Sequence, residues 1–175
     1  DRVLITGAGP IGALAALCAR SAGALTVYIS EPNAARRERA AALGVATVLD
    51  PTSVDLPVYL RDQSDGLGVD VAIECSGHPT GFSDAVRSLR RRGTLAQTGL
   101  FVGEAVVEPM LWALNDLTIV GTWCYWVYDF DRIAAQIAAP KPVAAPSVQV
   151  LVARNALRTG QLIKPEDLRW QAWPQ

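Results

Sequence analysis

The sequence contains few cysteines, and they form no recognisable pair or cluster. Cys18, Cys75 and Cys124 are far apart, and no CxxC spacing occurs. An odd number of cysteines without a framework spacing predicts free thiols in a reducing compartment rather than a secreted, disulfide-bonded domain. We therefore expect a cytoplasmic protein.

Long apolar runs and an excess of charge of one sign are also missing. No apolar run is long enough to span a bilayer, and no signal-peptide pattern opens the chain. The formal net charge is −1, with acidic and basic residues interspersed. These absences argue against a membrane or a nucleic acid as partner.

Groups that perform acid–base chemistry or ligate metals are scarce. The chain has one histidine, His78, in a short loop that ends at Pro79. A zinc site made of Cys75, His78 and Cys124 matches no known ligand spacing, and no Ser/His/Asp or Tyr/Lys arrangement is visible. We therefore predict no catalytic residue and no metal ligand, and interpret His78 as a loop residue at the rim of a cleft.

The chain does contain alternating strand-like and helical segments, and half of its residues are hydrophobic. This alternation is typical of βαβ units in a parallel sheet. We expect strands over 3–6, 25–30, 47–49, 69–75, 94–98 and 117–121, and helices over 11–22, 33–43, 54–64, 79–91, 109–114 and 130–138. The sequence thus predicts an α/β fold, a doubly wound, parallel, six-stranded Rossmann sheet of order 3-2-1-4-5-6.

Helix ends and segment boundaries are predicted from local composition. Gly23, Gly44 and Gly93 are expected to end helices, and the basic run 90–92 is interpreted as the cationic end of the helix before Gly93. Residues 139–147 are rich in proline and alanine and predict a linker between a domain over 1–138 and an appendage over 148–175. Because the chain opens directly on an apolar strand, we also expect a missing preceding segment.

A GxGxxG motif directly follows the first predicted strand and opens the first predicted helix. Gly7 permits a tight turn, Gly9 allows a pyrophosphate to approach the backbone, and Gly12 allows close packing of the helix on the sheet. Pro10 and Ile11 complete the loop, whose free N–H groups and helix dipole favour an anion. The alternative is that these glycines merely end a strand, but the strand–loop–helix context favours a dinucleotide.

The adenosine half of the dinucleotide is predicted to lie near Glu31, 19 residues after Gly12. A carboxylate at this spacing is the expected partner of the ribose hydroxyls, and it repels a 2′-phosphate. The nearby Arg36 and Arg37 complicate this interpretation, because an arginine can accommodate that phosphate. We predict NAD as the cofactor, with NADP as the less favoured alternative. The alternative without a ligand is that Glu31 is a solvated acidic residue in a turn.

These residues together resemble a known family. The stretch from Val3 to about Ala138 is similar to the cofactor domain of the zinc-dependent, medium-chain alcohol and polyol dehydrogenases, especially the butanediol, sorbitol and threonine dehydrogenases. The resembling segments are the motif at 7–12, Ser30-Glu31-Pro32 with Arg36-Arg37, and the stretches 41–44, 68–71 and 116–125.

The resemblance implies roles for further residues. Ile11 would contact the pyrophosphate or nicotinamide side, and Glu31 and Arg36 would hold the adenosine ribose. Loops after the fifth and sixth strands would lie along the nicotinamide; their residues are Thr98, Gly99, Leu100, Thr122, Trp123 and Cys124. Ordinary packing at strand ends is the alternative for these two loops, since no polar side chain in them demands a ligand.

In this family a separate domain supplies the catalytic zinc, which needs three protein ligands and an open position. The resemblance therefore implies the NAD(H)-binding half of an oxidoreductase whose zinc lies in a missing domain, and we expect this half to be inactive alone. The apolar surface left by the missing domain also predicts homo-oligomer formation.

The tail, residues 148–175, resembles a different family. The stretches 150–160 and 163–174 are similar to the beginning of an SAF domain of pilus-assembly proteins and flagellar chaperones. Residues 148–153 are expected to form a strand and residues 164–168 a short helical turn. The join suggests a truncated dehydrogenase fused to part of another gene. Two other functions stay open: a non-catalytic dinucleotide-binding module, and a pilus or flagellar assembly protein that carries the Rossmann domain as a passenger.

Overall fold

The computed structural model describes residues 1–124, 126–138, 149–153 and 168–172. The chain divides into two compact units, Asp1–Ala139 and Pro140–Gln175. The strands of the first unit are β1 (Arg2–Thr6), β2 (Thr26–Ser30), β3 (Thr47–Leu49), β4 (Val69–Glu74), β5 (Leu89–Gln97) and β6 (Thr118–Gly121). Its helices are α1 (Pro10–Ser21), α2 (Ala34–Ala42), α3 (Leu56–Asp62), α4 (Pro79–Ser88), α5 (Pro109–Leu114) and α6 (Val127–Ala138).

The first unit is built on one parallel sheet of order β3-β2-β1-β4-β5-β6. The register places Ile5 of β1 beside Ile29 of β2 and Ile73 of β4, so all three strands end at the same edge. The predicted six-stranded Rossmann topology is confirmed.

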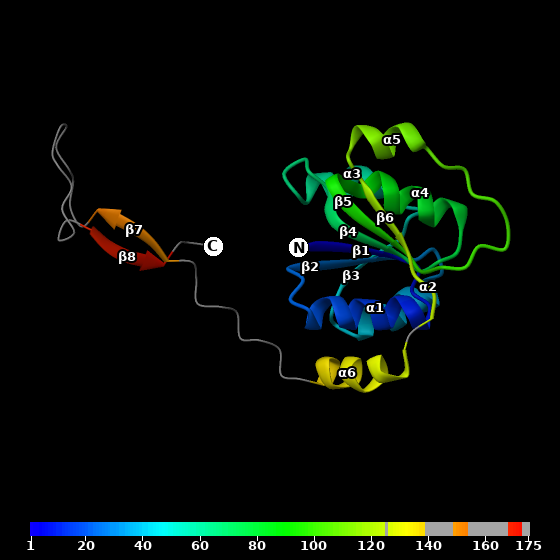
Figure 1. The fold of residues 1–175 in the computed structure, drawn as a ribbon, viewed down its shortest axis with the longest axis horizontal. Helices are drawn as coiled ribbons and strands as arrows, with labels where there is room; N and C mark the ends of the chain where they lie inside the picture. Colours follow the sequence, from blue (N-terminus) through cyan, green and yellow to red (C-terminus); the bar gives the residue numbers. More distant parts are fainter. Residues whose placement is uncertain (125, 139–148, 154–167, 173–175) are drawn as a thin grey trace. The chain divides into compact units, whose positions relative to one another are not determined.

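Helices cover both faces of this sheet (Figure 1). Successive residues of a strand point to opposite faces, and β1 shows this directly. Leu4 packs with residues of α3 and α4, whereas Val3 and Ile5 pack with Ala16 of α1. Because both faces are buried, the central strands are almost continuously apolar, which explains why the sequence predicted them well.

The end of α4 corrects the expectation from sequence. A helix was expected over 79–91, but α4 ends at Ser88 and β5 begins at Leu89. Arg90 donates to the Asp70 carboxylate of β4 at 2.6 Å, which fixes it in the sheet. Arg92 adopts a positive φ of 60°, within an irregularity in the β4–β5 register. Residues 90–92 and Gly93 are therefore part of a strand, since tertiary pairing overrides the helix preference of arginine.

The start of α6 also differs. The helix was expected from residue 130, but it begins at Val127. Asp129 therefore lies in the first turn of the helix and pairs with Arg132 at 2.9 Å.

The second unit contains an antiparallel pair of strands, β7 (Gln149–Ala153) and β8 (Leu168–Ala172). The strand expected over 148–153 is confirmed. The expected linker at 139–147 and most of the helical turn at 164–168 lie outside the described residues, except that Leu168 belongs to β8. The likeness of the tail to SAF domains stays a prediction.

Candidate functional site

The predicted site residues gather at the carboxyl edge of the sheet. Backbone hydrogen bonds join the loops that follow neighbouring strands: Gly7 N to Ser30 O (2.7 Å), Cys75 N to Thr6 O (2.9 Å), Gly99 N to Glu74 O (2.7 Å) and Thr122 N to Gln97 O (2.9 Å). The structure therefore brings the glycine motif, the Glu31 turn and the loops after β5 and β6 into one continuous edge. This edge is where open parallel sheets bind ligands.

Two glycines of the motif are required by the fold itself. Gly7 has a φ of +93°, and a Cβ on it would lie 3.0 Å from Ser76 Cα. A Cβ on Gly12 would overlap the backbone oxygen of Gly7, because α1 packs closely against the preceding turn. Both positions are buried, so internal packing alone accounts for them.

Gly9 behaves differently from the other two. Its φ is −71°, which any residue can adopt. A Cβ on Gly9 would have no protein atom within 4 Å. The fold therefore does not require glycine here, and the open space beside Gly9 is what a ligand approaching the backbone would use.

No side chain of the N-cap residue accepts a hydrogen bond from the backbone N–H groups in the first turn of α1. Its N-cap, Gly9, offers no side-chain hydrogen bond, and no acidic residue lies in the first turn. By contrast, Asn33, Asp55 and His78 cap α2, α3 and α4; the short helix α5 has no side-chain cap either. An uncapped helix start beside an open glycine suits a bound anion, because the N–H groups and the helix dipole both face it.

Glu31 lies directly after β2 and is only 3% exposed. Its carboxylate accepts from the backbone N–H of Ala8 and from that of Asn33, each at 2.9 Å. These bonds tie the glycine loop to the turn after β2 and fix the carboxylate at the edge of the site.

The two neighbouring arginines have separate roles. Arg37 is occupied by the carbonyls of Glu31 and Pro32 and by an ion pair with Asp50 at 2.8 Å. Arg36 lies 3.9 Å from the Glu31 carboxylate, and its side chain is 57% exposed. Of the pair, Arg36 is thus the one that a ligand can reach.

The loops after β5 and β6 lie side by side. Thr122 Oγ1 is 3.0 Å from Thr98 Oγ1, and a Cβ on Gly99 would overlap Glu74 Oε2 and Gly77 N. Leu100 and Trp123 are 63% and 73% exposed, and Cys124 is exposed as well. On the other side, Ile11 is 55% exposed beside the glycine loop. Large apolar groups that stay uncovered at a sheet edge favour a ligand or another protein surface as their partner.

Sequence reasoning missed one residue of this edge, Glu74. Its side chain is completely buried at the end of β4, where it accepts from Ser76 N at 2.7 Å and from Gln97 Nε2 at 2.8 Å. An acidic residue at the end of an apolar strand is a usable signal, because carboxylates are almost never fully buried without partners. Its partners, however, become visible only in the folded chain.

The metal site considered from sequence does not assemble. Within the described part of the chain, no group of three histidine, cysteine or acidic residues is placed to hold a metal ion. His78 is used as the N-cap of α4, where its Nδ1 faces Thr80. Burial raises the pKa of Cys75 to about 12, so the thiol is protonated at neutral pH.

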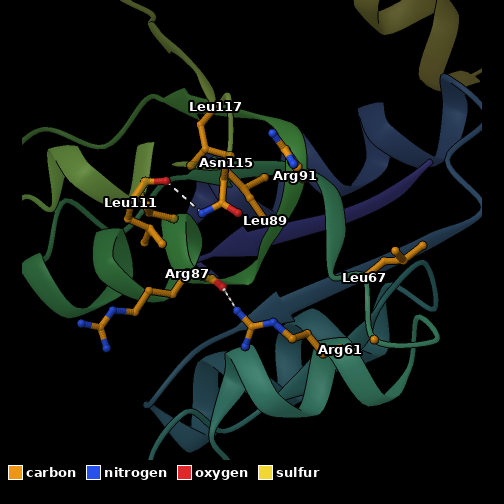
Figure 2. A pocket seen from close by; sticks show the side chains of 10 residues that line it. Arg61, Leu67, Arg87, Leu89, Arg91, Leu111, Asn115 and Leu117 are labelled. Carbon is orange, nitrogen blue, oxygen red and sulfur yellow. Dashed lines mark hydrogen bonds between the residues drawn. The ribbon is translucent and has the colours of Figure 1, made fainter. Parts of the chain in front are cut away.

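A pocket of about 290 Å³ lies elsewhere, at the opposite edge of the sheet (Figure 2). It is lined by residues that precede or open β4, β5 and β6, among them Leu67, Leu89 and Leu117. Its arginines are engaged: Arg61 donates to Arg87 O at 2.8 Å, Arg87 pairs with Glu108, and Arg91 pairs with Asp116 at 3.1 Å. All three arginines that line this pocket therefore have protein partners, and the pocket is separate from the candidate site.

Comparison with known proteins identifies the family. Residues 10–139 match the family described as zinc-binding dehydrogenase. The chain belongs to this family. Its first unit is thus the Rossmann NAD(P)-binding domain of a zinc-binding dehydrogenase, as the glycine motif and the strand order indicated. The match ends before the tail.

Similar relatives include L-threonine 3-dehydrogenase of Pyrococcus horikoshii, 38% identical over 137 residues, and sorbitol dehydrogenase of Halalkalibacterium halodurans, 37% identical over 102 residues. The first alignment covers 75% of this chain and 39% of that enzyme, and the second 58% and 30%. The chain spans about two fifths of the length of the L-threonine 3-dehydrogenase that it matches.

Solved structures of dehydrogenases have a similar fold over most of this chain. 2R,3R-butanediol dehydrogenase from Bacillus subtilis has a TM-score of 0.71 at 27% identity, over 78% of this chain and 39% of that one. A zinc-binding dehydrogenase from Sinorhizobium meliloti, bound to NADP, has a TM-score of 0.70 at 27% identity, over 78% and 41%. No helix among the described residues is long and apolar enough to cross a membrane.

Proposed function

We propose that the chain binds NAD and serves as the cofactor-binding part of a zinc-dependent alcohol or polyol dehydrogenase. The observation that carries this proposal is the open space beside Gly9. Packing explains Gly7 and Gly12, whereas no protein atom lies within 4 Å of a Cβ on Gly9, which lies directly at the uncapped start of α1. The uncapped start of α1 supplies the N–H groups that a pyrophosphate needs.

The cofactor would extend in both directions from this point. Glu31 and Arg36 would hold the adenosine ribose beside β2. Loops 98–100 and 122–124 would line the nicotinamide beside β5 and β6, with Ile11, Leu100 and Trp123 shielding the ring from water. The nicotinamide supplies the hydride acceptor. Cys75, His78 and Cys124 do not fit a zinc site, and no step through zinc is assigned to this chain. That the chain alone transfers no hydride, and that its exposed apolar surface forms oligomers, stay predictions.

A calorimetric titration of the 175-residue chain with NAD tests the proposal. We expect saturable binding and a rise in Tm, because NAD at a hundred times its Kd stabilises the folded state by about 2.7 kcal/mol. Binding that is absent in calorimetry and in the thermal shift would refute the cofactor role.

A second prediction concerns the choice between NAD and NADP. Glu31→Gln removes the negative charge that repels a 2′-phosphate and leaves the exposed guanidinium of Arg36 in place. We expect the preference for NAD over NADP to fall about tenfold, measured as the ratio of the two Kd values.

The control is Glu38→Gln, which removes the same charge from an exposed position on α2. It should leave the ratio unchanged. An unchanged ratio in Glu31→Gln, or tighter binding of NADP than of NAD by the unmodified chain, would contradict the assignment to NAD.

A further inference from the structure

Glu74 is a buried carboxylate that no ion pair compensates within the described residues. It is fully buried, and hydrogen-bond donors alone surround it. Removing a carboxylate from water is costly unless its oxygens are well satisfied. A fold that needed only packing here would use an apolar side chain, so the group requires an explanation.

The donors come from one loop and from the ends of two strands. Oε1 accepts from the N–H and the hydroxyl of Ser76, from Gly77 N at 3.0 Å and, more weakly, from Thr6 Oγ1 at 3.4 Å. Oε2 accepts from Gln97 Nε2 at 2.8 Å. The carboxylate therefore joins the end of β1, the loop after β4 and the end of β5.

The hydrogen bond from Gln97 of β5 requires an acceptor atom at the end of the Glu74 side chain. Gln97 Nε2 donates to the backbone oxygen of Gly99 at 2.8 Å as well as to Glu74. Rotating the Gln97 amide would set its carbonyl against both oxygens, so its orientation is fixed. A Cβ on Gly99 would overlap Glu74 Oε2, so the loop after β5 packs directly on the carboxylate.

We propose that Glu74 is a positioning residue for the nicotinamide half of the dinucleotide; this inference rests on the proposed NAD-binding function. The adenosine half lies over β2, at Glu31, and the pyrophosphate lies at the start of α1. The remaining half must lie over β4, β5 and β6. The Glu74 carboxylate fixes the loops after β4 and β5 relative to each other, and the second of these carries Thr98, Gly99 and Leu100. Ordering those loops before binding strengthens the nicotinamide contacts, because less entropy is lost when the ligand binds.

The test compares a whole dinucleotide with its adenosine half. In Glu74→Gln, the new amide would face Gln97 Nε2, donor against donor, and the bond between the loops would be lost. We expect the Kd for NADH, measured by fluorescence titration, to rise about tenfold, whereas the Kd for AMP, measured by calorimetry, stays within about twofold.

Asp70→Asn is the matched control, because Asp70 lies at the other end of β4. Its carboxylate accepts from Arg2 N and from Arg90 Nε, each at 2.6 Å. This variant should lower the stability of the sheet and change neither Kd. Should Glu74→Gln fail to fold, Gln97→Met removes the bonds from Gln97 to Glu74 and to Gly99 O and leaves the other donors to Glu74 in place. It should weaken NADH binding about fivefold with AMP binding unchanged.

An unchanged Kd for NADH in a folded Glu74→Gln or Gln97→Met variant overturns the proposal. Equal losses for NADH and AMP overturn it too, because they show a general structural effect. If the unmodified chain binds AMP and NADH with the same affinity, the nicotinamide half makes no contact and the inference falls while adenosine binding stands. If it binds neither, the proposed function itself fails.

Discussion

Replacing Gly9 by valine is expected to abolish dinucleotide binding without a loss of stability. The backbone at Gly9 has a φ of −71° and extended ψ, which valine adopts readily. No protein atom lies within 4 Å of the added Cβ, so the folded chain has room for it. The same Cβ would occupy the space through which a pyrophosphate approaches the start of α1. We expect the Kd for NAD to rise at least about a hundredfold, measured by calorimetry.

Gly103→Val is the matched control for this result. A Cβ at Gly103 also meets no atom within 4 Å, but the residue lies in the loop between β5 and α5. This variant should bind NAD like the unmodified chain. Undiminished binding by Gly9→Val would show that the space beside Gly9 serves no ligand, and a large fall in its Tm without NAD would show that packing does require the glycine.

Replacing Gly12 by alanine is expected to give the opposite result, a large loss of stability. The added Cβ would overlap the backbone oxygen of Gly7, so α1 must move away from the end of β1. Overpacking of this kind costs about 2 kcal/mol, which lowers the Tm of a domain of this size by roughly 6 °C. Thermal unfolding without ligand measures the effect.

Gly103→Ala is the control here, because its Cβ enters open space. Its Tm should stay close to that of the unmodified chain. A Gly12→Ala variant as stable as this control would mean that the contact between α1 and the glycine loop is looser than the structure shows. Within the motif, we thus expect replacement of Gly12 to lower stability and replacement of Gly9 to weaken dinucleotide binding.

The candidate site was predictable wherever a local pattern carried the information. The spacing of Gly7, Gly9 and Gly12 after an apolar strand indicated the phosphate loop, and Glu31 followed from its distance along the chain. Which glycine serves the fold and which serves a ligand was not predictable. That distinction depends on Ser76 and on the backbone oxygen of Gly7, atoms that approach these positions only after folding.

Errors and omissions occurred where partners distant in sequence decide the structure. Residues 90–92 look like the end of a helix, but the Asp70 carboxylate and pairing with β4 hold Arg90 in a strand. Glu74 was overlooked because its partner Gln97 lies 23 residues away.

The sequence by itself determined the alternation of strands and helices, the sheet order and the position of the glycine loop. These features follow from hydrophobic periodicity, from right-handed crossovers and from local turn chemistry, which act over a few residues or apply to every parallel sheet. Only the tertiary structure decided where α4 gives way to β5, which arginine faces Glu31 and how the buried Glu74 carboxylate joins the ends of β1 and β5 to the loop after β4. These depend on contacts between distant segments, and such contacts exist only when the sheet has formed.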